Sequence, residues 1–119
     1  MKLYSYSGCS TCRRAIAWLR QHGLTVELID ITLTPPGRPL LEQALTQLGR
    51  GRLFNTSGQS YRALGAATVK AMDDSQAIEA LAADGRLIKR PLLVSDDGRL
   101  LIGFKPEEWQ TLLEEGAAP

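Results

Sequence analysis

The stretch Ser7-Gly8-Cys9-Ser10-Thr11-Cys12-Arg13-Arg14 stands between a short alternating apolar run, Leu3–Tyr6, and a helical pattern that continues from Ala15. A Cys-x-x-Cys pair between a strand and a helix indicates redox chemistry. Unpaired N–H groups and the positive end of the helix dipole stabilise a thiolate at a helix start. We therefore expect Cys9, still in the loop, to be the nucleophile. Cys12, one turn further on, is the expected resolving thiol, because it can attack a mixed disulfide on Cys9.

Other uses of the two cysteines remain open. Zinc needs four protein ligands, or three and water, and the chain has 2 Cys and 1 His, so we expect no metal. A permanent disulfide would close too small a loop to add much stability. Two inert, buried thiols are a further alternative, which the polar neighbours Ser10 and Thr11 disfavour. His22 precedes Gly23 at the expected end of the helix, so we expect an exposed cap rather than a catalytic base.

The composition is that of an ordinary globular domain. The 119 residues suffice for a core without disulfides, and we expect one domain, residues 1–119. A formal charge of +1 disfavours direct nucleic-acid binding. The N-terminus lacks the pattern of a signal peptide, and no apolar run reaches the length of a membrane span. We therefore expect a cytoplasmic protein without membrane contact, in a compartment where thiols are kept reduced.

Hydrophobic periodicity and turn residues predict the secondary structure. Strands are expected at Lys2–Tyr6, Leu24–Ile31, Pro91–Val94 and Leu100–Phe104. Helices are expected from Cys12 to His22, from Pro39 to the stops at Gly49 and Gly51, over Ala66–Met72, from the cap Asp73–Ser75 to Asp84, and from Lys105 onward. The polar stretch Leu53–Tyr61 is predicted to be an irregular surface loop.

This order of elements is that of a thioredoxin-like α/β fold. The first two strands are expected to be parallel, because a helix connects them. The turn Asp96–Gly98 predicts an antiparallel hairpin. The expected architecture is thus a four-stranded mixed sheet with a helical block inserted between the second and third strands. By analogy with that fold, Pro91 should lie against the thiol loop, and the Arg90–Pro91 peptide bond should be cis.

Several stretches resemble the family that contains the glutaredoxin-linked arsenate reductases (ArsC) and the transcription regulator Spx. The resemblance spans nearly the whole chain and is that of a reductase-like member. It rests on Cys9–Arg13, Leu53–Gly58, Tyr61–Gly65, Lys89–Pro91, Gly103–Lys105 and Trp109.

The resemblance implies roles for particular positions. The nucleophile of the family falls on Cys9, and the arginine one turn into the helix falls on Arg13. The arginine that faces the thiol in arsenate reductases falls on Arg90, where its charge favours a thiolate or a bound oxyanion. Two further arginines of those reductases fall on Asn55 and Gly103, so two positive charges are missing here. Those reductases also lack the second cysteine.

These positions lead to two hypotheses and a third, less favoured one. The first is a thiol–disulfide oxidoreductase that acts on protein or small-molecule thiols and disulfides, with glutathione or glutaredoxin as reductant and no bound cofactor. The second is an Spx-like redox-sensing regulator that binds the C-terminal domain of the RNA polymerase α subunit, with Gly49 in the contact region. The simpler interpretation of Gly49 is a helix stop. Arsenate reduction comes third, because the missing arginines weaken oxyanion binding.

Overall fold

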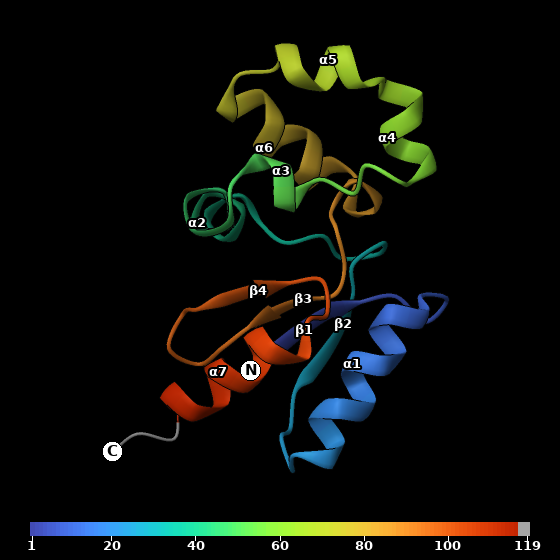
Figure 1. Ribbon diagram of the computed structural model, residues 1–119. Coiled ribbons are helices and arrows are strands. Elements are labelled where there is room, and N and C mark those ends of the chain that lie inside the picture. Colours follow the sequence, from blue (N-terminus) through green and yellow to red (C-terminus); the bar gives the residue numbers. More distant parts are fainter. Residues whose placement is uncertain (117–119) are drawn as a thin grey trace.

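A four-stranded sheet lies at the centre of the protein (Figure 1). The computed structural model of the protein describes residues 1–116. The strands lie in the sheet in the order β2-β1-β3-β4. Strand β1 is parallel to β2 and antiparallel to β3, and β3 is antiparallel to β4. The predicted mixed sheet of a thioredoxin-like fold is therefore confirmed. The strands are β1 (Lys2–Ser5), β2 (Glu27–Asp30), β3 (Leu92–Val94) and β4 (Leu100–Ile102).

Two helices cover one face of the sheet, α1 (Ser10–Gln21) and α7 (Pro106–Gly116) (Figure 1). Side chains alternate between faces along a strand, so Leu3 and Leu93 point to this side. They pack there with Leu19 and the fully buried Trp109. Burial of so large an aromatic ring anchors the last helix to the sheet.

The other face carries the helical block that the sequence predicts between the second and third strands. Tyr4 and Leu92, on the alternate strand positions, pack into its core. Asp73 caps the last α-helix of the block through a reciprocal pair of hydrogen bonds with Gln76, as the sequence indicates. The block consists of α2 (Arg38–Leu48), α3 (Arg50–Leu53), α4 (Gln59–Leu64), α5 (Ala66–Ala71), α6 (Asp74–Ala83) and a 3-10 turn, η1 (Gly85–Leu87).

The prediction of an irregular surface loop over Leu53–Tyr61 is wrong at both ends of that stretch. Leu53 and Phe54 are buried, and Phe54 forms an isolated antiparallel bridge with Ile88. The second half of the stretch opens α4. Gly51 lies inside α3 and does not stop a helix. The polar composition concealed the bridge because the backbone partner of Phe54 lies more than thirty residues away along the chain.

Other element boundaries also differ from the expectation. The first helix begins at Ser10, two residues before the predicted start at Cys12. The second strand is confined to Glu27–Asp30 of the predicted Leu24–Ile31, and the other strands are shorter as well. Gly49 does end α2, with a φ of 82° that glycine adopts without strain, and its N–H donates to the carbonyl of Leu45.

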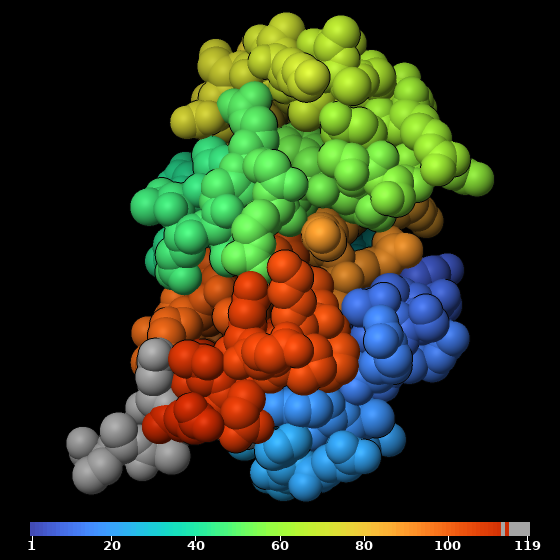
Figure 2. Space-filling model, viewed as in Figure 1, coloured from blue at the N-terminus to red at the C-terminus, as the bar shows by residue number. Residues whose placement is uncertain are grey.

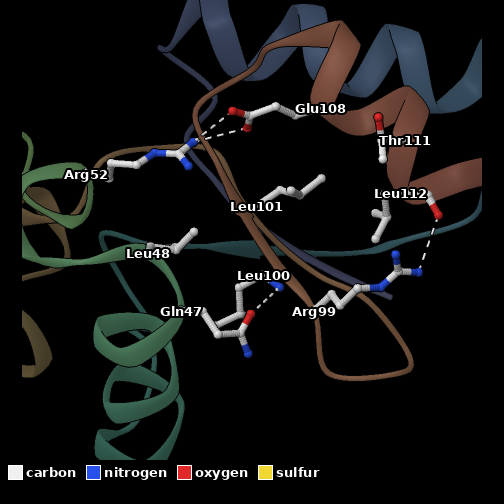
Figure 3. A pocket seen from close by; sticks show the side chains of 9 residues that line it. All are labelled: Gln47, Leu48, Arg52, Arg99, Leu100, Leu101, Glu108, Thr111 and Leu112. Carbon is white, nitrogen blue, oxygen red and sulfur yellow. Dashed lines mark hydrogen bonds and ion pairs between the residues drawn. The ribbon is translucent and has the colours of Figure 1, made fainter. Parts of the chain in front are cut away.

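The side-chain amide of Gln47 on α2 pairs with the outer edge of β4 where that strand begins (Figure 3). Its Nε2 donates to the carbonyl of Gly98 at 3.0 Å, and its Oε1 accepts from the N–H of Leu100 at 3.1 Å. A residue of an added parallel strand would make the same two bonds. Gln47 therefore satisfies two backbone groups of this edge and joins α2 to the sheet.

We expect Gln47→Ala to lower the free energy of unfolding by about 1 kcal/mol, because both edge groups then lose their partner. Chemical denaturation measures this change. Gln43→Ala, at an exposed position one turn earlier on the same helix, is the matched control and should change stability by less than about 0.5 kcal/mol. Equal stability of the two variants would contradict the role of Gln47.

Candidate active site

The thiol loop joins β1 to α1 and places Cys9 at the N-cap of that helix. The Sγ of Cys9 accepts a hydrogen bond from the N–H of Cys12 at 3.3 Å, and the N–H of Cys9 donates to the carbonyl of Tyr6 at 3.1 Å. Cys9 is half-buried, whereas Cys12 is fully buried. The reachable sulfur is thus the one that faces the N–H groups of the helix start.

The pKa values of the two thiols are shifted in opposite directions. Burial alone raises the pKa of Cys9, but hydrogen bonds from Cys12 and from the guanidinium of Arg90, together with the charge of Arg90, hold that pKa below its ordinary value. Burial, reinforced by the hydrogen bond to Cys9, raises the pKa of Cys12 to about 12. The two shifts favour the thiolate of Cys9 and the protonated thiol of Cys12, the arrangement that nucleophilic attack by Cys9 requires.

Arg90 reaches the thiol from the segment that leads into β3. Its guanidinium carbon lies 5.0 Å from the centre of the Tyr6 ring, a cation–π contact that orients it. The next peptide bond, Arg90–Pro91, is cis, as expected from the fold, and Pro91 is buried. Tyr6 was not singled out from the sequence. Only the approach of β3 to β1 brings Tyr6 and Arg90 together.

Three further positions singled out from the sequence lie on the loop or the first turn of α1. Arg13 turns back and donates from Nη1 to the carbonyl of Ser7 at 2.8 Å, so it braces the loop. Thr11 accepts a weak hydrogen bond from Arg14 at 3.5 Å. Ser10 is exposed.

Asn55 and Gly103, where the resemblance to arsenate reductases places two arginines, lie on other segments. Asn55 follows the buried Phe54, and its N–H donates to the carbonyl of Leu87 at 2.7 Å, so it lies beside the segment that carries Arg90. Gly103 follows β4 with a φ of 69°, a backbone conformation that strains any larger residue. The local backbone itself therefore favours glycine over arginine at position 103.

Gly49 lies in the helical block and not in the thiol loop. The neighbouring Arg50 is engaged within the chain, since its guanidinium donates to the carbonyl of Met72 at 2.7 Å and pairs with Asp74 at 2.7 Å. A partner contact at Gly49 stays a prediction.

Within residues 1–116, no three His, Cys, Asp or Glu side chains gather as metal ligands would. In the same part of the chain, no helix is both long and apolar enough to cross a bilayer. His22 is exposed at the C-cap of α1, where its ring packs on Trp18.

The two pKa values predict selective alkylation. Iodoacetamide should modify Cys9 of the reduced protein first, with a midpoint below that of an ordinary thiol, and leave Cys12 unmodified near neutral pH. Reactivity should fall as the pH drops through the pKa of Cys9, because only the thiolate reacts. Peptide mapping and the pH dependence of the rate measure both effects.

Arg90→Gln should shift that midpoint upward, because the thiolate loses a hydrogen bond and a nearby positive charge. Arg20→Gln, which removes an equal charge near the other end of α1, should leave it unchanged. Equal alkylation of the two cysteines, or an unchanged midpoint in Arg90→Gln, would contradict the assignment.

Fold and site together define a thioredoxin-like protein with a Cys-x-x-Cys pair at the first helix. The ArsC family model matches residues 4–112, and the chain belongs to that family. It is 36% identical to the uncharacterized protein YusI of Bacillus subtilis, over 92% of this chain and 95% of that protein. It is 29% identical to the global transcriptional regulator Spx of Streptococcus agalactiae, over 93% and 81%.

A solved structure shares the same architecture. It is a Streptococcus mutans protein described as a possible arsenate reductase, with a TM-score of 0.82 and 41% identity, over 92% of this chain and 96% of that one. The chain is therefore similar both to arsenate reductase-like proteins and to Spx-type regulators, as the sequence indicated.

Proposed function

We propose that the protein is a thiol–disulfide oxidoreductase in which Cys9 is the nucleophile and Cys12 the resolving thiol. The observation that carries this proposal is the position of Cys9 at the N-cap of α1, half-buried and hydrogen-bonded by both Cys12 and Arg90. A stabilised yet reachable thiolate suffices for disulfide exchange.

The reaction has two exchange steps. The thiolate of Cys9 attacks one sulfur of the substrate disulfide, which breaks the substrate S–S bond, forms a mixed disulfide on Cys9 and expels the first thiolate. Cys12 then attacks the sulfur of Cys9, expels the second thiolate and leaves a Cys9–Cys12 disulfide. The substrate gains two electrons and two protons, and the protein dithiol loses them.

The second step requires Cys12 to lose its proton, because the thiolate is the attacking form. After burial, the largest influence that raises the pKa of Cys12 is its hydrogen bond to Cys9, and the charge of Cys9 adds to it. Both disappear once Cys9 is in a mixed disulfide, so Cys12 becomes easier to deprotonate at that stage. The expelled thiolate accepts the proton.

Two molecules of glutathione, or a glutaredoxin dithiol, would restore the reduced protein by the reverse exchange. Glutathione would be oxidised to its disulfide in that step. Arsenate is a less favoured substrate, because Asn55 and Gly103 stand where arsenate reductases carry arginines, so two of the three arginines around the oxyanion are missing and Arg90 is the one that remains.

A second candidate function is redox-dependent regulation. The similarity to Spx, and 29% identity to the regulatory protein MgsR of Bacillus subtilis, favour it. In this case oxidation of the Cys9–Cys12 pair would change a surface that binds the RNA polymerase α subunit, with Gly49 in the contact region. Such a protein needs a stable partner but no turnover.

Steady-state reduction of hydroxyethyl disulfide, with glutathione and its NADPH-dependent recycling enzyme, distinguishes the two functions. An oxidoreductase consumes many equivalents of NADPH per protein molecule above the uncatalysed rate, whereas a regulator is oxidised once and stops. A parallel reaction with arsenate tests the third hypothesis. Oxidation without turnover would contradict the enzymatic proposal and direct the work to binding of the RNA polymerase α subunit.

A further inference from the structure

A small cavity of about 240 Å³ opens beside Arg90, on the side of the sheet that carries the helical block. Figure 2 shows a hollow where the yellow-green α4, the orange segment before β3 and the blue N-terminal part meet. Two of the residues that line the cavity, Tyr6 and Arg90, also contact Cys9. The cavity is also lined by the polar residues Thr32, Asn55, Ser60 and Arg86.

Backbone contacts fix the walls of this cavity. Gly85 packs so closely on the carbonyl of Ile31 that a Cβ at position 85 would lie 1.8 Å from its oxygen. The residues that follow these two, Arg86 and Thr32, are thereby held on the same wall. A hydrogen bond from Lys89 to the carbonyl of Leu53, 2.9 Å long, keeps the segment before Asn55 next to the segment before Arg90. The cavity is therefore part of the folded framework.

The residues that line the cavity have the chemistry of an anion-binding site. Two arginines, Arg86 and Arg90, line it together with residues that carry hydroxyl and amide groups. Neither arginine forms an ion pair with a carboxylate in the part of the chain that the structure describes. The charge of Arg86 also acts on Asp30, whose pKa is lowered first by its hydrogen bonds with Thr32 and less by Arg86. The Oδ1 of Asp30 accepts from the N–H of Thr32 at 2.9 Å and from its hydroxyl at 2.6 Å. Guanidinium groups bind a carboxylate through paired, charge-assisted hydrogen bonds.

We infer that this cavity binds a carboxylate of the group carried by the sulfur that Cys9 attacks, and that Arg86 selects for it. The inference rests on the proposed exchange function. Its ligand class is a small thiol or disulfide with carboxylate groups, such as glutathione. A cavity of 240 Å³ accommodates one end of such a molecule. Arg90 spans the distance between the reacting sulfur and the cavity, so an adduct on Cys9 has its acidic end directed toward Arg86.

Single-turnover oxidation of the reduced protein tests this inference. The two oxidants are oxidised glutathione and its ethyl ester, which keep the same atoms around the sulfurs and differ in their carboxylates. The wild-type protein should react about tenfold faster with the free acid. Arg86→Gln should remove that advantage and leave the rate with the ester unchanged. Arg20→Gln, an equal loss of charge outside the cavity, should leave both rates unchanged.

The outcomes separate the inference from the function on which it rests. Equal rates of the wild-type protein with acid and ester would overturn the carboxylate site while leaving thiol exchange intact. Arg86→Gln that slows both oxidants equally would likewise overturn it. No reaction of the wild-type protein with either oxidant would overturn the exchange function itself, and the assigned role of the cavity with it.

Discussion

Cys9→Ser is expected to lower the turnover of small disulfides by about a thousandfold or more. The hydroxyl of serine keeps nearly the same volume at the N-cap of α1, and serine is a favourable N-cap residue, so the fold should persist. A serine oxygen does not exchange with a disulfide, so the first step has no nucleophile. Steady-state consumption of NADPH in the glutathione-coupled assay measures the loss, and circular dichroism checks that the variant is folded.

Cys12→Ser is the informative comparison. It retains the nucleophile and the N–H that donates to it, but removes the resolving thiol. The first exchange should still occur, and the mixed disulfide on Cys9 should accumulate, visible by mass spectrometry as a single adduct. The assigned roles would be wrong if Cys9→Ser retained full activity or if the adduct formed on Cys12 in the variant that lacks Cys9.

The order of helices and strands along the chain followed from local signals. The loop before the first helix, the helix stop at Gly23 and the turn at Asp96–Gly98 are each readable within a few residues, and together they allow few topologies. The position of Cys9 at a helix start followed in the same way. The cis bond before Pro91 required knowledge of the fold, because nothing in Arg90 or Pro91 alone distinguishes the isomers.

What the sequence did not predict depends on contacts between distant segments. Leu53 and Phe54 are buried because Lys89 and Ile88 pair with them, and a polar stretch gives no local sign of such a pairing. The ring of Tyr6 contacts the guanidinium of Arg90 because β3 pairs with β1. The cavity beside Arg90 likewise combines segments from four parts of the chain. Periodicity describes one element at a time and therefore cannot reveal a site of this kind.

The second large effect is expected at Gly85, the first residue of the 3-10 turn η1 that follows α6. An added Cβ would lie 1.8 Å from the carbonyl oxygen of Ile31 and 2.8 Å from its carbon. Both neighbours are backbone atoms in the buried core, so the clash cannot be relieved by rotating a side chain. Gly85→Ala should therefore lower the free energy of unfolding by about 3 kcal/mol or more, at the upper end of the usual cost of overpacking. Thermal and chemical denaturation measure the change.

Gly51→Ala provides the control, because a Cβ at that position meets nothing within 4 Å and the residue lies in the helix α3. It should stabilise the protein by about 0.5 kcal/mol, as alanine is the better helix former.

Any separation of the Ile31 and Gly85 segments would also move Thr32 away from Arg86, and these two residues line one wall of the cavity. Gly85→Ala that remained folded should therefore lose the preference for oxidised glutathione over its ester while Cys9 stays reactive. Wild-type stability in this variant would show that the two segments are not held in contact.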